Sequence, residues 1–136
     1  MTTDTTTGAD VGVVRTAFEA FGKGDMATFG ATFHDDATWN HRNEDRFAGV
    51  HAGRDAILAF IGESGQLTDG TLRAAPQAIL ADGDGRVAVL VRLSGNRPDG
   101  RTLDSTQVLL FAIDGDRIRA VDQFIGEPGP VSAFWE

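Results

Sequence analysis

The chain has 136 residues, 41% of them hydrophobic and 24% charged, and this composition predicts one compact domain with one core. A formal net charge of −8 at pH 7 argues against a surface that binds nucleic-acid phosphates or anionic lipids. The absence of cysteine excludes disulfides, thiolate nucleophiles and cysteine metal sites. Because tyrosine is absent too, histidine, carboxylate and amide side chains are left for proton chemistry.

The N-terminal residues 1–9 have neither a basic start nor an apolar run, which predicts a disordered tail rather than a signal peptide. No stretch of the chain approaches the length of a membrane span. We therefore expect a soluble, cytoplasmic protein whose single domain covers residues 10–136.

Three helices are predicted in the first half of the chain. Asp10 is expected to cap a helix that ends at residues 22–24, because its apolar residues recur at intervals of three and four. Asp25 is expected to cap a second, short helix whose apolar stripe extends to Phe33. A third helix is predicted over residues 54–61.

The remaining elements are predicted to be strands. A strand over residues 37–41 places Trp39 and His41 on the same face, since side chains alternate along a strand. The polar residues 42–53 then predict a long loop. Its charged side chains are expected to form a solvated lid: Arg42, Glu44, Asp45 and Arg46. Asp-Gly and Pro-containing turns separate four further strands, with antiparallel hairpin signals, at 71–81, 86–95, 102–113 and 117–125.

The strand over residues 86–95 is apolar on both faces, which is typical of a central strand that is covered on both sides. Helices can cover one face of the sheet, and a second copy of the chain is the simplest cover for the other. We therefore expect an α+β fold, with three N-terminal helices on the concave face of a curved, mostly antiparallel sheet, and a homodimer through the sheet face.

Four segments carry a distributed pattern whose order and spacing matter more than any one piece: residues 18–25, 33–39, 47–57 and 114–118. From about Val11 to Trp135 the chain resembles the SnoaL-like and ketosteroid-isomerase-like branch of the nuclear-transport-factor-2-like superfamily. This resemblance implies a cone-shaped pocket, but it does not imply one reaction. The family includes isomerases, polyketide cyclases, epoxide hydrolases, dehydratases, ligand binders and assembly domains.

The resemblance also implies positions for site residues. The family's proton-shuttling carboxylate falls on His41, and its oxyanion-binding aspartic acid falls on Gln107. The tyrosine of the family's first helix is matched by Ala17 or Phe18. Ketosteroid isomerase, a worked case for which a carboxylate base and two strong donors are described, needs groups that this chain lacks at those positions. Efficient steroid isomerisation is therefore not expected, and His41 facing Gln107 remains.

Three residues are the catalytic candidates. His41 is the first, because an imidazole with a reference pKa of ~6.5 exchanges protons at neutral pH, although a histidine held at a strand end has the same pattern. Gln107 offers an amide N–H to a developing oxyanion, or it serves as the partner of a buried polar group. Asp122 is the alternative base, although strand alternation turns Gln123 inward and Asp122 outward unless a bulge reverses them. An outward Asp122 is expected on the sheet face, as a dimer contact or paired with Arg92 or Arg119.

The other residues expected in the ligand pocket are mainly apolar or aromatic. No histidine pair or carboxylate cluster with ligand spacing occurs, so we expect no metal, and no dinucleotide or phosphate-binding motif occurs, so we expect no cofactor. The expected pocket wall consists of Phe18, Trp39, His51, Phe60, Val91, Leu109 and Gln123.

The leading functional hypothesis is a cofactor-independent isomerase, cyclase or dehydratase that transfers protons on an apolar, polyketide- or terpenoid-like carbonyl compound. In this hypothesis His41 acts as base and acid, and Gln107 polarises the carbonyl. Alternatives are a non-catalytic binding protein and a dimerisation module of the same fold. Epoxide hydrolysis is a further enzymatic alternative, which needs a water held by carboxylate and amide groups.

Overall fold

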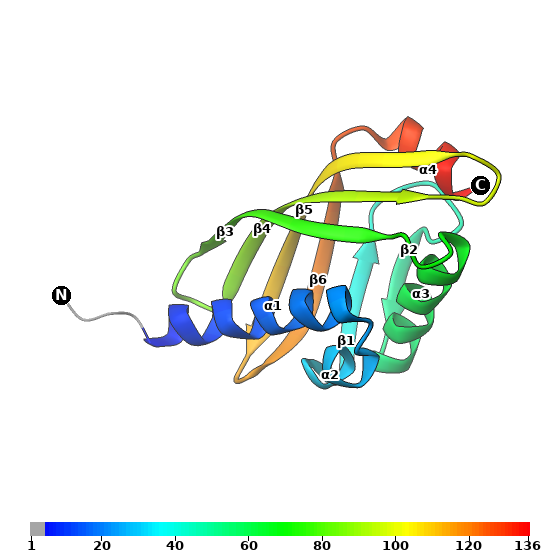
Figure 1. Cartoon of the computed structure of the whole chain (residues 1–136). Helices are drawn as coiled ribbons and strands as arrows, with labels where there is room; N and C mark the ends of the chain where they lie inside the picture. The colour runs from blue at the N-terminus through cyan, green and yellow to red at the C-terminus, as the bar shows by residue number, and fades with distance from the viewer. Residues whose placement is uncertain (1–4) are drawn as a thin grey trace.

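The computed structural model describes residues 5–136, with side chains from Gly8 onward, and forms an α+β fold around one curved sheet (Figure 1). The strands lie in the order β2-β1-β6-β5-β4-β3. Neighbouring strands are antiparallel except β1 and β6, which are parallel. The strands are β1 (Phe33–His41), β2 (Gly49–Ala52), β3 (Arg73–Ala81), β4 (Arg86–Asn96), β5 (Thr102–Asp114) and β6 (Arg117–Ile125).

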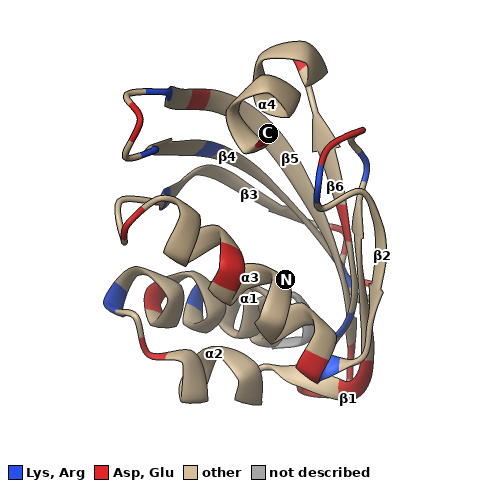
Figure 2. Cartoon of the chain, turned by 90° about the vertical axis from the view of Figure 1, so that its right-hand side faces the viewer, with Lys and Arg blue, Asp and Glu red and all other residues tan. Residues whose placement is uncertain are grey.

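The helices cover the concave side of this sheet, as Figure 2 shows for α1, α2 and α3. This arrangement confirms the predicted fold class. No helix in the described part of the chain is both long and apolar enough to span a membrane. The helices are α1 (Thr5–Lys23), α2 (Met26–Ala31), α3 (Arg54–Leu67) and α4 (Pro128–Trp135).

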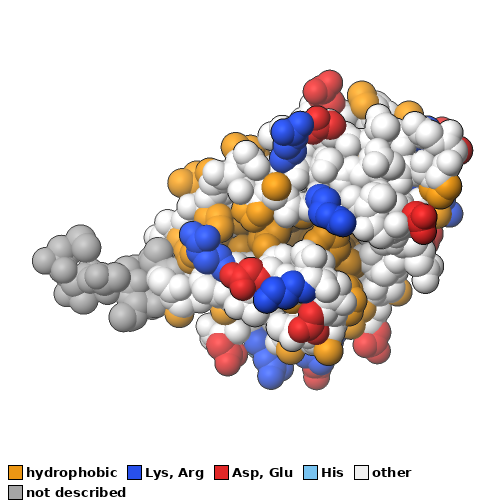
Figure 3. All heavy atoms as spheres, in the orientation of Figure 1, with side chains coloured by type: hydrophobic (Ala, Val, Ile, Leu, Met, Phe, Trp, Pro, Cys, Tyr) orange, Lys and Arg blue, Asp and Glu red, His pale blue; other side chains and the backbone are white. Residues whose placement is uncertain are grey.

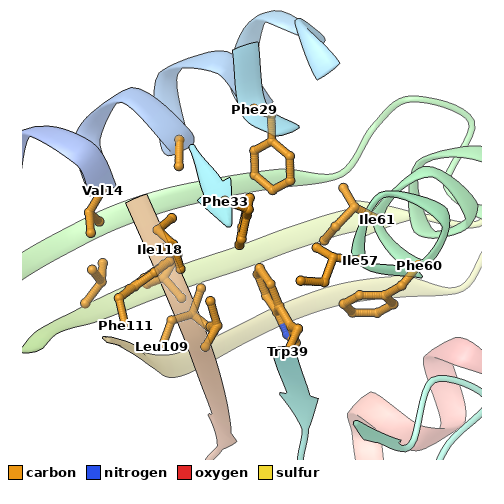
Figure 4. Packing of buried hydrophobic residues seen from close by; sticks show 14 of the residues in the cluster. Val14, Phe29, Phe33, Trp39, Ile57, Phe60, Ile61, Leu109, Phe111 and Ile118 are labelled. Atoms are coloured by element: carbon orange, nitrogen blue, oxygen red, sulfur yellow. The ribbon is translucent and has the colours of Figure 1, made fainter. Parts of the chain in front are cut away.

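The hydrophobic core lies between the helices and the inner face of the sheet (Figure 4). Phe33 at the start of β1 and Ile118 on β6 are fully buried. Trp39 from β1 and Phe60 from α3 meet edge to face, with ring centroids 5.7 Å apart. Burial of each such side chain contributes about 1.5–3 kcal/mol, so this layer fixes α3 against β1 and thereby fixes one side of the cavity described below.

The start of the first helix differs from the prediction. Helix α1 begins at Thr5, so residues 5–9 are helical and do not belong to a disordered tail, while residues 1–4 of the predicted tail lie outside the described residues. Asp10 is buried within the helix instead of capping it. Apolar periodicity showed where a helical face begins to pack, but it did not show where the backbone becomes helical.

Two further helix boundaries were also wrong. Helix α2 ends at Ala31, and Phe33 begins β1 instead of closing the helix. The cap at Asp25 is confirmed, since its carboxylate accepts a hydrogen bond from the Thr28 backbone N–H at 3.1 Å. Helix α3 extends beyond Ile61 to Leu67, because its apolar face continues against the core through two glycines that the sequence suggested as a terminus.

Two elements were missed. Strand β2 lies inside the predicted loop over residues 42–53 and pairs antiparallel with β1. Helix α4 was not predicted, because prolines at 128 and 130 indicate a loop, although proline is tolerated in the first turn of a helix. Its side chains Val131, Phe134 and Trp135 are buried, so α4 closes one end of the core.

Candidate functional site

An apolar cavity lies between the inner face of the sheet and the helices. About 80 Å³ of it is open to the centre of a water molecule, which is room for several waters or a small ligand. Figure 3 shows hydrophobic side chains gathered in the middle of the face that carries α1, with charged side chains around them. Eight of the residues that the sequence singled out line the cavity: Phe18, Trp39, His41, Phe60, Val91, Gln107, Leu109 and Gln123.

His41 lies at the end of β1, and its side chain is 3% exposed. Its Nε2 is 2.9 Å from Oδ2 of Asp45, and its Nδ1 is 2.9 Å from Oε1 of Gln123. The rings of Phe47 and Phe60 approach the imidazole edge to face, at 6.1 and 5.7 Å. The imidazole is therefore enclosed by aromatic rings, and each of its nitrogens lies against an oxygen atom.

Asp45 was expected in a solvated lid, and this expectation was wrong: its side chain is 0% exposed. The loop after β1 turns its carboxylate inward, where Oδ1 accepts from the Phe47 backbone N–H at 2.8 Å and Oδ2 accepts from Asn43 Nδ2 at 2.7 Å. Burial raises the pKa of Asp45, but hydrogen bonds from His41, Phe47 and Asn43 outweigh burial and hold this pKa below its ordinary value of 3.8. Asp45 is thus an ionised carboxylate beside His41.

Gln123 connects His41 to the opposite side of the polar cluster. Its Oε1 accepts from the Trp39 indole N–H at 2.9 Å, and its Nε2 donates to Gln107 Oε1 at 2.7 Å. Gln107 Nε2 in turn donates to Ser105 Oγ at 3.3 Å. His41 was expected to face Gln107 directly. That was wrong, because β6 lies between β1 and β5 and brings Gln123 between them.

Asp122 does not reach the cavity. It faces the outer side of the sheet, as strand alternation predicts, and pairs with Arg42 at 3.0 Å. The register irregularity between β5 and β6 lies at Ala112 and Ile113, so it leaves the alternation at Asp122 intact. The expected partner Arg92 instead pairs with Asp104 at 2.7 Å. The structure therefore removes Asp122 from the catalytic candidates, and with it the carboxylate considered for epoxide hydrolysis.

His51 was expected on the pocket wall but does not line the cavity. Its ring stacks on Phe60, with centroids 4.3 Å apart and planes 9° from parallel. Its Nε2 lies 2.8 Å from the Phe47 carbonyl oxygen. His51 thus supports the back of a ring whose other side faces the cavity.

Two important wall residues were missed. Phe47 follows the buried Asp45, and Trp135 comes from α4; their rings meet edge to face at 5.0 Å. The apolar side chains of segment 131–135 were the available signal for α4. Within residues 5–136, no three histidine or carboxylate side chains form a group able to hold a metal. Among the lining residues, His41 is the one with a titratable side chain.

Comparison with known proteins shows relatives along nearly the whole chain. An uncharacterized protein of Mycobacterium tuberculosis is 32% identical over 127 residues, which is 93% of this chain and 96% of the relative. The structure of Bal32a, from a soil-derived mobile gene cassette, superposes with a TM-score of 0.93 at 30% identity, covering 96% of this chain and 99% of Bal32a.

More distant structures show the fold alone. A protein from Sinorhizobium meliloti assigned as a polyketide cyclase has a TM-score of 0.69 and 24% identity, with 82% of this chain and 92% of that protein covered. NTF2-like and ketosteroid-isomerase-like folds also occur among the similar structures. The family model of the SnoaL-like domain matches residues 14–121, and the chain therefore belongs to the SnoaL-like family, with an NTF2-like fold.

Proposed function

We propose that this protein isomerises, cyclises or dehydrates a small, largely apolar carbonyl compound by proton transfer, without a cofactor. The observation that carries the proposal is the His41–Asp45 pair at the wall of an otherwise apolar cavity. A buried imidazole backed by a carboxylate is a common arrangement for general acid–base catalysis.

His41 supplies the proton transfer in this proposal. One ring nitrogen gives a proton to the carbonyl oxygen and takes one from the neighbouring carbon, so that the imidazole returns to its starting state. Asp45 stabilises the charge on the ring throughout, since its carboxylate is held by three donors at 2.7 to 2.9 Å. Proton transfer by a positioned side chain contributes roughly 10²–10⁴-fold to a rate.

The amide groups supply donors for the substrate oxygen. Gln107 Nε2 has one long hydrogen bond, to Ser105 Oγ at 3.3 Å, so its N–H groups are available to a ligand. In an apolar environment such a donor stabilises negative charge that develops on oxygen. The S. meliloti neighbour assigned as a polyketide cyclase is the reason to test polyketide-like ketones first.

Ligand binding without chemistry is the second candidate function. It is favoured by the occupied ring nitrogens of His41, because a base that already contacts Asp45 and Gln123 must leave one of them before it can accept a substrate proton. Under this alternative the same cavity binds the carbonyl compound and releases it unchanged.

The deciding experiment combines native mass spectrometry with hydrogen–deuterium exchange. The first identifies any small molecule retained by the purified protein; the second follows exchange at the carbon beside the carbonyl, in that molecule and in 1-indanone, by NMR in D₂O. We expect exchange with the wild type and with His34→Gln, and roughly 10²–10⁴-fold slower exchange with His41→Gln. His34 is the matched control, because it lies at the surface and contacts the Asp114 carbonyl oxygen. Saturable binding with no exchange would favour the second candidate.

A further inference from the structure

The direction of each hydrogen bond in the polar cluster can be derived from Trp39. An indole N–H only donates, so the atom of Gln123 that lies 2.9 Å from Trp39 Nε1 must be the amide oxygen. The same oxygen lies 2.9 Å from Nδ1 of His41, and an oxygen that only accepts requires a proton on Nδ1.

The second ring nitrogen is also protonated. Nε2 of His41 lies 2.9 Å from Oδ2 of Asp45, a carboxylate that already accepts hydrogen bonds from Asn43 and from the Phe47 backbone. A lone pair on Nε2 would face the lone pairs of an ionised carboxylate, which is repulsive. Each ring nitrogen therefore donates, and His41 is an imidazolium ion paired with Asp45.

The amide groups follow from the same starting point. Because the oxygen of Gln123 faces Trp39 and His41, its NH₂ group must face Gln107, whose Oε1 accepts at 2.7 Å. The NH₂ group of Gln107 is then the one left for Ser105 and for the cavity. Both amide oxygens are used within the cluster, and N–H groups remain for a ligand.

We propose that Trp39 is a positioning residue that sets the polarity of this site, so that the cavity selects ligands with a hydrogen-bond acceptor, such as a ketone or enolate oxygen, over ligands that only donate. The ligand class rests on the proposed function, but the hydrogen-bond direction does not. It also follows that His41 starts a reaction as an acid and becomes a base only after it has given up a proton.

The first test is nitrogen NMR of the imidazole rings in the full-length protein at neutral pH, which is independent of any ligand. The chain has three histidines, so His41→Gln and His34→Gln assign the signals. We expect both His41 nitrogens to be protonated in the wild type. One unprotonated nitrogen on His41 would overturn the hydrogen-bond direction, whatever the protein catalyses.

The Trp39→Phe variant tests the positioning role, because it keeps an aromatic ring and removes the N–H. Once that N–H is gone, the Gln123 amide is free to turn its NH₂ group toward Nδ1, and we expect the His41 nitrogen signals to change. Trp135→Phe is the matched control: Trp135 also lines the cavity, but its indole N–H has no hydrogen-bond partner among the described residues. Signals that keep the wild-type protonation pattern in Trp39→Phe would overturn the role of Trp39.

The second test compares three bicyclic probes of similar size: 1-indanone, which only accepts, indole, which only donates, and indane, which does neither. We expect wild-type protein to bind 1-indanone at least about fivefold more tightly than indole or indane, the factor expected from one hydrogen bond. Trp39→Phe should reduce this preference. Equal binding of 1-indanone and indole, or no binding of 1-indanone, would overturn the ligand class. Binding of 1-indanone without exchange at its carbon would contradict the catalytic proposal and leave this inference intact.

Discussion

His41 and Asp45 are four residues apart, and their side chains form an ion pair that is almost completely withdrawn from solvent, with Nε2 and Oδ2 2.9 Å apart. The loop that follows β1 makes the pair possible, because the Phe47 backbone N–H and Asn43 Nδ2 compensate the buried carboxylate. The pair gives the cavity its charged group and gives the fold a point of high sensitivity.

Replacing Asp45 with Asn should lower the free energy of unfolding by about 3 kcal/mol, because it leaves His41 without a buried counter-ion. Asp122→Asn is the matched control, since it breaks an exposed pair with Arg42 and should cost no more than about 1 kcal/mol. Urea denaturation of both variants and the wild type measures the difference. Equal losses would show that Asp45 is no more important than a surface carboxylate.

Acid should remove the contribution of Asp45. Its pKa is lower in the folded protein than the ordinary value of 3.8, so its contribution to stability is complete well above pH 3.8 and is lost as the pH falls through the folded pKa. The pKa values of Asp25, Asp82, Asp99 and Asp104 are lowered as well, so the wild type alone does not isolate Asp45.

The measurement is therefore the difference in unfolding free energy between wild type and Asp45→Asn, followed from pH 7 downward. We expect this difference to shrink below pH 3.8. A difference that stays constant to the lowest pH at which both proteins fold would contradict the ionised state assigned to Asp45.

Filling the cavity should abolish binding without unfolding the protein. Leu109 lines the cavity, whereas its neighbour Leu110 points to the other face of β5. Leu109→Trp should cost about 1–3 kcal/mol of stability through overpacking and should prevent 1-indanone from binding. Leu110→Trp should keep binding. Calorimetric titration tests both, and unchanged affinity in Leu109→Trp would place the ligand elsewhere.

The outer face of the sheet should pair with a second copy of the chain. Leu90, Val108 and Phe124 are exposed side by side on adjacent strands, because Leu90 is in register with Val108 and Val108 with Phe124. Ion pairs flank this row on both sides, at Arg92–Asp104 and Arg42–Asp122, so a twofold copy can place apolar row on apolar row.

Light scattering should give the mass of a dimer for the wild type and of a monomer for Val108→Lys. Thr106→Lys, on the same face of β5 but outside the row, is the control and should remain dimeric. A monomeric wild type would rule out the sheet interface.

Much of the fold follows from local patterns in the sequence. Alternation along β1 and β6 placed Trp39 and His41 on one face and turned Asp122 away from Gln123, and the structure agrees. The Asp-Gly turns marked the hairpins, as at Gly85, whose φ of 85° and close approach to the Ile113 carbonyl suit glycine. These features depend on neighbouring residues alone, which is why they could be predicted.

The composition of the site was decided by tertiary structure. Whether Asp45 lies in solvent or against His41 depends on backbone donors in a loop that has no periodicity, and nothing local distinguishes it from the exposed Glu44. Helix α4 forms because its apolar side chains find a surface to pack against, despite two prolines. The contact of His41 with Gln123 rather than Gln107 follows from the position of β6 between β1 and β5. The sequence by itself determined which face each strand residue presents, since that depends on backbone geometry. Only the tertiary structure decided which side chains meet, because strand order and loop closure bring together residues that are far apart in the chain.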